Sequence, residues 1–415
     1  MPISRRALIT MMAAAPTATR AATPRFLSRK ISDIRIVPGI ETLLSSRLGL
    51  LAGRRIGLVT NHTGVDRQGR RDVNLLRAAN IDVGALFSPE HGIAGIAAAG
   101  EKVGHGTDLT TGLPVYSLYG STREPTAEML AGIDTLVFDM QDVGARFYTY
   151  PSTLMLILRA AAKAAIPVVV LDRPNPMGGE LVEGPLLDPA LTSFIGIFAM
   201  PVVHGMTMGE LARMFVAEQK LPVDLTVIPM RGWYRGIGQL HPEHIPWIAP
   251  SPNIKWRWTP LVYPGTALFE GTNVSEGRGT KRPFEYIGAP FIHGGELSKY
   301  LNAMGIAGTK FHPKSFTPTE SKYAGKLCGG VQLLTPDRAS FRPFRTGVAM
   351  VKAVHDLYPK KFKFLAGTPS HFDRLAGVNW VREDIIAGKS MAEIEAKWHA
   401  DEAAFRETRK PYLLY

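Results

Sequence analysis

The sequence predicts an α/β protein in which a Rossmann-like parallel sheet domain is followed by a smaller α+β C-terminal domain. Strand-like apolar runs alternate with helix-like segments between residues 54 and 172. Pro, Gly, Trp and Asn then become abundant over 241–293, and helical patterns with a few strands fill 294–415. A chain of 415 residues also exceeds the size of one ordinary core, so more than one domain is expected.

The first domain is expected over 36–240. Its apolar runs, at 55–61, 83–90, 135–139 and 167–172, are rich in Val, Leu and Ile, which indicates a parallel sheet covered on both faces. A helix is expected from 207 to 219, because Thr207 can cap it and Glu210 follows three residues later. Residues 241–293 are expected to be a loop-rich active-site segment, and 391–408 one amphipathic helix of the C-terminal domain.

The N-terminus has the pattern of an export signal. Arg5 and Arg6 precede a short apolar run at 7–15, and small residues follow up to Ala22, as in signals of the twin-arginine kind. The apolar run is too short to cross a bilayer, and no later stretch reaches 18 apolar residues. The sequence therefore predicts removal of residues 1–22 and a mature chain that is periplasmic or secreted and does not span the membrane.

Charge and motif content narrow the choice of partners and cofactors. The formal net charge is +12, but the basic residues are scattered and no zinc-finger or RNA-binding motif occurs, so no nucleic-acid partner is expected. The single cysteine, Cys328, excludes an intrachain disulfide and a cysteine metal site. Neither a G-x-G-x-x-G nor a G-x-x-x-x-G-K-[ST] loop is present, and no cofactor or metal is expected. No sequence pattern indicates an oligomeric state.

Polar or ionisable residues follow four of the predicted strands. In open α/β sheets ligands bind beyond the carboxyl ends of the strands, so these side chains are expected to converge on one cleft. The alternative is that polar residues simply begin loops. The side chains concerned are Asn61, His62, Glu90, His91, Asp139, Asp142, Asp172 and Arg173.

Two glutamates suit glycoside cleavage, which needs a carboxylic acid beside the leaving oxygen and a group that stabilises positive charge at the anomeric carbon. Glu90 ends a strand between Pro89 and His91, where a bend would direct it into a cleft. Glu276 lies in a polar, glycine-punctuated loop. The alternative for each is a solvated charge, and for Glu276 an ion pair with Arg278.

Aromatic residues crowd around 249–253, where Asn253 could bond to sugar hydroxyls. Aromatic faces stack on sugar rings, although packing at the domain junction would explain the same pattern. The aromatic residues are Trp247, Trp256, Trp258 and Tyr263.

Seven strings, in order along the chain, resemble the NamZ/YbbC family of exo-β-N-acetylmuramidases. They are L-V-T-N-H-T-G at 58–64, F-S-P-E-H-G at 87–92, D-M-Q-D-V-G-A-R-F-Y-T-Y at 139–150, D-R-P-N-P at 172–176, V-H-G-M-T at 203–207, P-S-P-N at 250–253 and F-E-G-T-N-V-S-E-G-R-G-T at 269–280.

The resemblance implies an active site between the two domains and release of N-acetylmuramic acid from the non-reducing ends of peptidoglycan glycan fragments. It implies Glu90 as the catalytic glutamate, and Glu276 is carried over as the second. Arg146 or Arg278 is expected to bind the lactyl carboxylate of the substrate, because a guanidinium suits a carboxylate. Further substrate-binding candidates within the strings are Tyr148, Asn175, His204 and Asn273.

Two other functions remain open from the residues alone. A metal-dependent hydrolase such as a deacetylase could use His62, His91, His204, Asp139 and Asp142 as ligands, although no H-E-x-x-H pair occurs. A non-catalytic peptidoglycan-binding protein is the second alternative.

Overall fold

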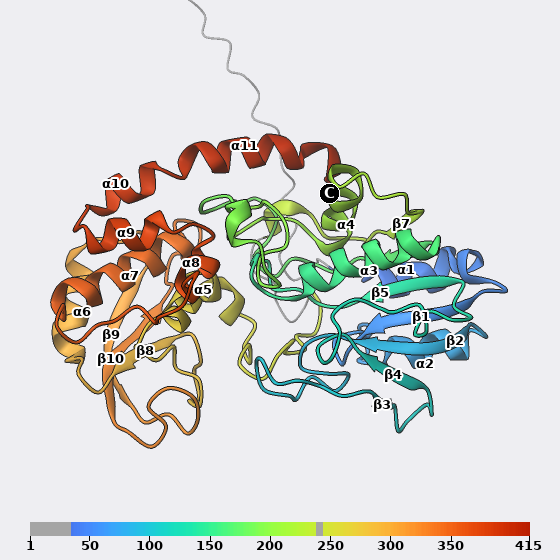
Figure 1. Ribbon diagram of the computed structural model, residues 1–415, viewed down its shortest axis with the longest axis horizontal. Coiled ribbons are helices and arrows are strands. Elements are labelled where there is room, and N and C mark those ends of the chain that lie inside the picture. The colour runs from blue at the N-terminus through green and yellow to red at the C-terminus, as the bar shows by residue number, and fades with distance from the viewer. Residues whose placement is uncertain (1–34, 238–243) are drawn as a thin grey trace, which may run out of the picture.

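The computed structural model describes residues 35–237 and 244–415, so the predicted export signal lies outside the described residues. Two domains lie side by side, one around a seven-stranded sheet and the other around a three-stranded sheet (Figure 1). The predicted fold class is confirmed. None of the described helices is long and apolar enough to cross a membrane.

The larger sheet has the strand order β3-β4-β2-β1-β5-β6-β7. Every neighbouring pair is parallel except β3 with β4, which is antiparallel. The carboxyl ends of the parallel strands therefore share one edge of the sheet, where ligands of such sheets bind. The strands are β1 (Arg55–Thr60), β2 (Asp82–Ser88), β3 (Gly106–Thr107), β4 (Pro114–Ser117), β5 (Thr135–Asp139), β6 (Val168–Leu171) and β7 (Leu225–Ile228).

Alternate side chains of the central strands enter separate cores on the two faces of the sheet. Phe138 and Val170 pack with α3 (Tyr150–Ala164) and α4 (Met208–Glu218). Val137 and Val169 pack on the opposite face, with α1 (Gly39–Ser46) and α2 (Asp72–Ala78). Burial on both faces explains why the strands read as nearly continuous apolar runs.

The predicted capping box at the start of α4 is present. Thr207 Oγ1 accepts a hydrogen bond from the Glu210 backbone N–H, and the Glu210 carboxylate accepts one from the Thr207 N–H. Thr207 also donates to Asp172 Oδ2 at 2.7 Å, which ties the helix to the end of β6. The helix ends at Glu218, one residue before the predicted end.

The smaller domain begins within the segment that was expected to be loop-rich. Residues 259–289 contain α5 (Thr259–Thr266), the 3₁₀ helix η5 (Ala267–Gly271) and β8 (Tyr286–Ala289). β8 belongs to the antiparallel sheet β8-β10-β9 with β9 (Lys310–Phe316) and β10 (Cys328–Leu334). The helices α6 (Gly294–Ala303), α7 (Pro343–Leu357), α8 (His371–Ala376) and α9 (Trp380–Ile386) complete the body of this domain.

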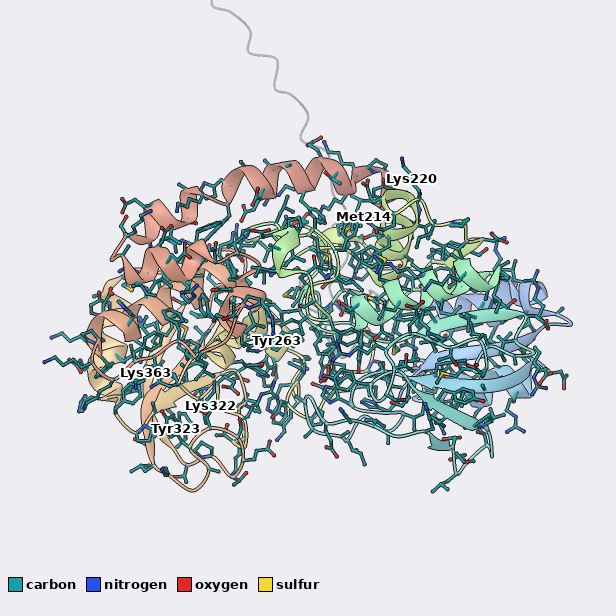
Figure 2. The ribbon with its side chains drawn as sticks, in the orientation of Figure 1. Met214, Lys220, Tyr263, Lys322, Tyr323 and Lys363 are labelled. Carbon is teal, nitrogen blue, oxygen red and sulfur yellow. The ribbon has the colours of Figure 1, made fainter. Side chains whose placement is uncertain are left out.

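Helices α5 and α7 approach closely at two glycines. The Gly265 carbonyl occupies the space that a side chain at position 347 would need, so both helices cross at backbone contact. This contact sets the position of α5, which carries Tyr263 to the junction of the domains (Figure 2).

The predicted single helix over 391–408 is instead two helices, α10 (Met391–Ala396) and α11 (His399–Arg409). A turn at Lys397 and Trp398 separates them, and the buried Trp398 ring packs edge-on against Phe344 with 5.2 Å between ring centroids. A continuous exposed helix would leave this indole unburied, so tertiary packing overrides the local pattern.

Helix α11 runs from the smaller domain to α4 of the larger one, where the chain ends (Figure 1). Arg409 donates to the carbonyls of His204 and Gly205, and Arg213 donates to the carbonyls of Tyr412 and Leu413. These bonds hold the C-terminal segment against the larger domain.

The stability of this attachment is expected to depend on pH through Asp172. Burial raises the pKa of this carboxyl to about 7, although Gly209, Tyr415 and Thr207 donate hydrogen bonds to it. Because the folded pKa lies above the unfolded one, the stabilising contribution is complete below about pH 4 and is lost as the pH rises through about 7.

We expect the melting temperature of Asp172→Asn to fall less than that of the unmodified chain between pH 5 and pH 8. Burial also raises the pKa of Glu183 to about 8, so the melting temperature of both proteins should still fall somewhat as the pH rises. If the melting temperatures of the two proteins, measured by circular dichroism, fall equally across this pH range, the role of Asp172 is contradicted.

Candidate active site

A cavity of about 250 Å³ lies between the two domains, beyond the carboxyl ends of β2, β4 and β5. Residues of α5, η5 and α8 close it from the other side. The polar side chains that line it are Glu90, His91, Tyr119, Tyr148, Thr149, Ser251, Tyr263, Glu270, Arg278 and His371. The cavity therefore brings four of the predicted site residues together: Glu90, His91, Tyr148 and Arg278.

Glu90 follows β2 in a tight turn. His91 and Gly92 both have positive φ angles, of 72° and 75°, which turn the chain sharply after the strand. The carboxyl group is held at both oxygens: Oε1 accepts from the Gly100 N–H at 2.8 Å, and Oε2 accepts from Thr149 Oγ1 at 2.8 Å. The Tyr119 hydroxyl also interacts with this carboxyl. Because a carboxylate has about four acceptor sites, at least one remains for a bound ligand.

His91 is a neutral residue beside this carboxyl. Burial lowers its pKa, and this outweighs the charge of Glu90, which raises it. Nδ1 lies 2.7 Å from the Ala97 carbonyl oxygen, which can only accept, so Nδ1 carries the hydrogen. Nε2 is then the unprotonated nitrogen and can accept a hydrogen bond from a substrate hydroxyl or a water molecule.

Glu270, at the end of η5, provides a second carboxylate on the wall formed by the smaller domain. Arg278 Nη2 donates to it at 2.8 Å, and His371 Nε2 lies 3.7 Å away. Burial alone would raise its pKa, but the charge of Arg278 and the hydrogen bond with His371 lower the pKa to about 2. Glu270 is therefore ionised throughout the physiological range.

Glu276 does not line the cavity and is enclosed by two cations. Its carboxylate lies 3.1 Å from Arg278 Nε and 3.0 Å from Lys322 Nζ, and the residue is 2% exposed. Lys322 belongs to the smaller domain (Figure 2). The expected alternative, an ion pair with Arg278, describes this geometry, and Glu276 supports Arg278 from behind.

The aromatic residues of the 241–293 segment separate into three places. Tyr263 lines the cavity and packs edge-on against Phe147 and Phe284, with centroid separations of 5.3 and 4.8 Å. Trp247 lines a small hollow beside Arg173. Trp256 and Trp258 stack on one another outside the cavity lining.

The two domains of the chain correspond to two separate matches to one protein family. The exo-β-N-acetylmuramidase NamZ family matches the chain in two parts, its N-terminal domain over residues 56–257 and its C-terminal domain over residues 261–415. The chain belongs to this NamZ family. The predicted family and the enzyme class, a glycoside hydrolase, are confirmed.

Individual relatives extend over nearly the whole chain. This chain is 46% identical over 395 residues to the peptidoglycan β-N-acetylmuramidase NamZ of Bacillus subtilis strain 168, and the alignment covers 95% of each chain. Crystal structures of two DUF1343 family proteins from Bacteroides fragilis NCTC 9343 have the same fold as this chain, with TM-scores of 0.86 and 0.74 and identities of 35% and 34%. Each covers 92% of this chain and 99% of the relative.

In this NamZ family member, two predicted residues after β1 position a loop of the cavity. Asn61 Nδ2 donates to the Tyr150 hydroxyl, which donates to the Pro250 carbonyl, and His62 Nε2 lies 2.7 Å from the Ala249 carbonyl oxygen. These bonds fix the 249–254 loop, from which Ser251 and Ile254 line the cavity. Asn253 is buried in the same loop but does not line the cavity.

The polar residues directly at the ends of β5 and β6 have partners outside the cavity. Asp139 is fully buried in a bidentate pair with Arg173, and Asp172 accepts four hydrogen bonds. Burial raises the pKa of Asp139, although Arg173 opposes this. Of the four strand ends that were predicted to converge on the cavity, only that of β2 brings its predicted side chains, Glu90 and His91, into the lining.

Four further predicted residues bond to nearby groups outside the cavity lining. Asp142 accepts from the Gly144 N–H, and His204 Nε2 lies 3.7 Å from it. Asn175 bonds to the backbone of Met206 and Met177. Asn273 bonds to the backbone of Lys361 and Lys363.

Arg146 is completely buried and reaches α8 rather than the cavity. It donates to the carbonyls of Pro185, Met200 and Leu375, and burial lowers its pKa to about 9. Leu375 lines the cavity at the end of α8, so Arg146 fixes this wall from behind. We therefore expect Arg146 to act on stability rather than on the choice of substrate.

Arg146→Lys is expected to lower the free energy of unfolding by about 1–3 kcal/mol, because an ammonium group cannot reach all three carbonyls. The preference of this variant for a muramic acid glycoside over an N-acetylglucosamine glycoside should equal that of the unmodified chain. Denaturant titration and the two kinetic constants test this, and a changed preference at unchanged stability would assign Arg146 to recognition.

The residues considered for a metal site have other partners. Within residues 35–237 and 244–415, no group of three or more His, Cys, Asp or Glu side chains is placed to hold a metal ion. His62 and His91 face carbonyls, and Asp139 pairs with Arg173.

Sequence reasoning did not select Tyr119, Thr149, Ser251, Glu270 or His371. Glu270 stands in the same string as Glu276, six residues earlier, but its partner His371 lies in a distant part of the chain. The apolar residues next to Glu270 in η5 could have indicated it, because a carboxylate among buried residues requires a partner.

Proposed function

We propose that this chain hydrolyses the glycosidic bond of a terminal, non-reducing N-acetylmuramic acid in peptidoglycan glycan fragments. The observation that carries the proposal is the pair Glu90 and Glu270, which line one cavity from different domains. The cavity of about 250 Å³ is smaller than the roughly 300–1,000 Å³ of typical ligand pockets. This size suits one terminal sugar and hence exo action.

In this proposal Glu90 protonates the leaving glycosidic oxygen, and Glu270 stabilises the positive charge that develops at the anomeric carbon. The ionised Glu270 can act as a nucleophile or can orient the 2-acetamido group of the substrate, which then attacks in its place. The neutral His91 accepts a hydrogen bond at Nε2. Tyr148 and Tyr263 supply aromatic walls for the sugar ring.

Of the two arginines expected to bind the lactyl carboxylate, Arg278 lines the cavity and Arg146 does not. Glu270 and Glu276 both bond to Arg278, and their charges raise its pKa against the effect of burial. We assign recognition of the lactyl group to Arg278. Arg278→Lys should then reduce the preference for muramic acid over N-acetylglucosamine glycosides.

The decisive experiment is digestion of purified glycan strands, followed by mass spectrometry of the products. We expect free N-acetylmuramic acid to accumulate from the non-reducing ends, with Glu90→Gln as the inactive control. Internal fragments would contradict exo action. Acetate release without cleavage would support a deacetylase, and binding without any product would support a non-catalytic peptidoglycan-binding protein.

We also propose that the chain is exported before it acts. The Arg5–Arg6 pair before a short apolar run supports this, and the substrate is a cell-wall polymer. Replacement of both arginines by Lys is expected to retain the chain in the cytosol of its native host. An intact N-terminus on protein recovered outside the cytosol would contradict signal removal.

A further inference from the structure

A second hollow, which we call the Trp258 groove, lies next to the active-site cavity. It is open, has a volume of about 700 Å³, and has Trp258, Arg282, Glu285, Lys310 and Arg338 among its lining residues. One layer of chain separates the two hollows: Tyr263 and Phe284 line the cavity, whereas their neighbours Val262 and Glu285 line the groove. A molecule bound in the groove would therefore lie close to the cavity without entering it.

An aromatic platform, made of Trp258 with Trp256 stacked on it, contributes the Trp258 ring to the lining of the groove. The rings of Trp256 and Trp258 are parallel to within 2°, with centroids 5.4 Å apart, and Trp256 is 41% exposed. Both indole N–H groups are bonded, that of Trp256 to the Lys281 carbonyl and that of Trp258 to Glu285 Oε1. The platform thus has a fixed orientation, and its Trp258 ring lines the groove, where an aromatic surface can pack against a sugar.

The lining of the groove has an excess of positive charge. Arg282, Lys310 and Arg338 line it, and Glu285 is the carboxylate among the lining residues. Glu285 lies 3.5 Å from Arg282 Nη1, whose guanidinium carbon is 5.2 Å from each tryptophan ring centroid. Neither Lys310 nor Arg338 forms an ion pair with a described residue, and the nearby charge of Arg257 adds to burial in lowering the pKa of Arg338.

We propose that the Trp258 groove is a second glycan-binding site, which holds a stretch of glycan strand whose sugars carry carboxylate groups. The aromatic platform fits sugar rings. Lys310 and Arg338, which form no ion pair with a described residue, fit the carboxylates of lactyl groups and stem peptides. The inference rests on the proposed function for the identity of the polymer. Binding here raises the effective concentration of chain ends at the cavity and requires no contact with the sugar that is cleaved.

The test compares a small substrate with a polymer. Trp258→Ala and Arg338→Gln are each expected to raise KM for long glycan strands about tenfold and to leave kcat unchanged. Both should hydrolyse a nitrophenyl glycoside of N-acetylmuramic acid, which fills only the cavity, like the unmodified chain. As a control, Arg47→Gln removes an exposed cation of the larger domain and should leave KM and kcat unchanged on both substrates.

Direct binding separates this inference from the proposed function. Glu90→Gln protein, which should not consume its ligand, is titrated with purified glycan strands, alone and in combination with Arg338→Gln. Weaker binding of the double variant supports the groove even if no turnover is ever observed. Equal affinity of the two proteins, equal effects on polymer and nitrophenyl glycoside, or tighter binding of a single-stranded oligonucleotide than of glycan would overturn the proposal.

Discussion

Glu90→Gln is expected to lower kcat on natural glycan strands by about 10²–10⁴-fold, the usual contribution of a general acid. Glutamine retains the shape of the side chain but cannot transfer a proton to the leaving oxygen. Its carbonyl oxygen can still accept from the Gly100 N–H, and its amide can donate to Thr149 Oγ1. The variant should therefore fold and bind substrate with little change in melting temperature.

A nitrophenyl glycoside separates proton donation from other roles of Glu90. Nitrophenol leaves with little protonation, so the loss on this substrate should be far smaller than the loss on natural glycan. Thr149→Val supplies a matched control, because it removes one hydrogen bond to the carboxyl and keeps the proton. We expect it to lower kcat modestly on natural glycan.

Equal losses on both substrates, together with a lower melting temperature, would show that Glu90 only orders the turn that follows β2. Activity at the unmodified level on natural glycan would also remove it from the acid role. Kinetics on both substrates and one thermal melt on the same preparation distinguish these outcomes.

The sheet domain was predictable from sequence because its signals are local. Val137 and Phe138, or Val169 and Val170, face different cores, so both faces of each strand are apolar and the runs are continuous. The cap of α4 is equally local, since Thr207 and Glu210 bond to each other's backbone. The break at Trp398 was not predictable, because its cause is the distant ring of Phe344.

The site was predictable only in part because polar strand ends serve two purposes. Glu90 and Asp139 both follow apolar strands, and local sequence does not distinguish them. Asp139 is neutralised by Arg173, which follows the neighbouring strand β6, whereas Glu90 faces the domain junction. Docking of the second domain decides which carboxylate meets a ligand, and Glu270 and His371 arrive only through that docking.

Glu270→Gln is the second change expected to have a large effect, a loss of about 10²–10³-fold in kcat, comparable to removal of one preorganised electrostatic group. The carboxylate is buried against Arg278, and its pKa of about 2 keeps it charged at neutral pH. The amide removes the negative charge next to the developing positive charge at the anomeric carbon. Unlike Glu90→Gln, this variant should lose activity equally on natural glycan and on the nitrophenyl glycoside.

Glu276→Gln is the matched comparison, because Glu276 bonds to the same Arg278 but lies outside the cavity. Removing its charge leaves Lys322 and Arg278 with less compensation, so stability should fall while kcat stays within about tenfold of the unmodified value. The reverse ranking, with Glu276→Gln inactive and Glu270→Gln active, would return the second catalytic role to Glu276.

The pH dependence of kcat gives a separate test of Glu270. Because its low pKa keeps Glu270 ionised down to about pH 2, a fall in kcat between pH 6 and pH 4 must come from a different group. Such a fall should therefore persist in the residual activity of Glu270→Gln, and its disappearance would mean that Glu270 titrates in that range.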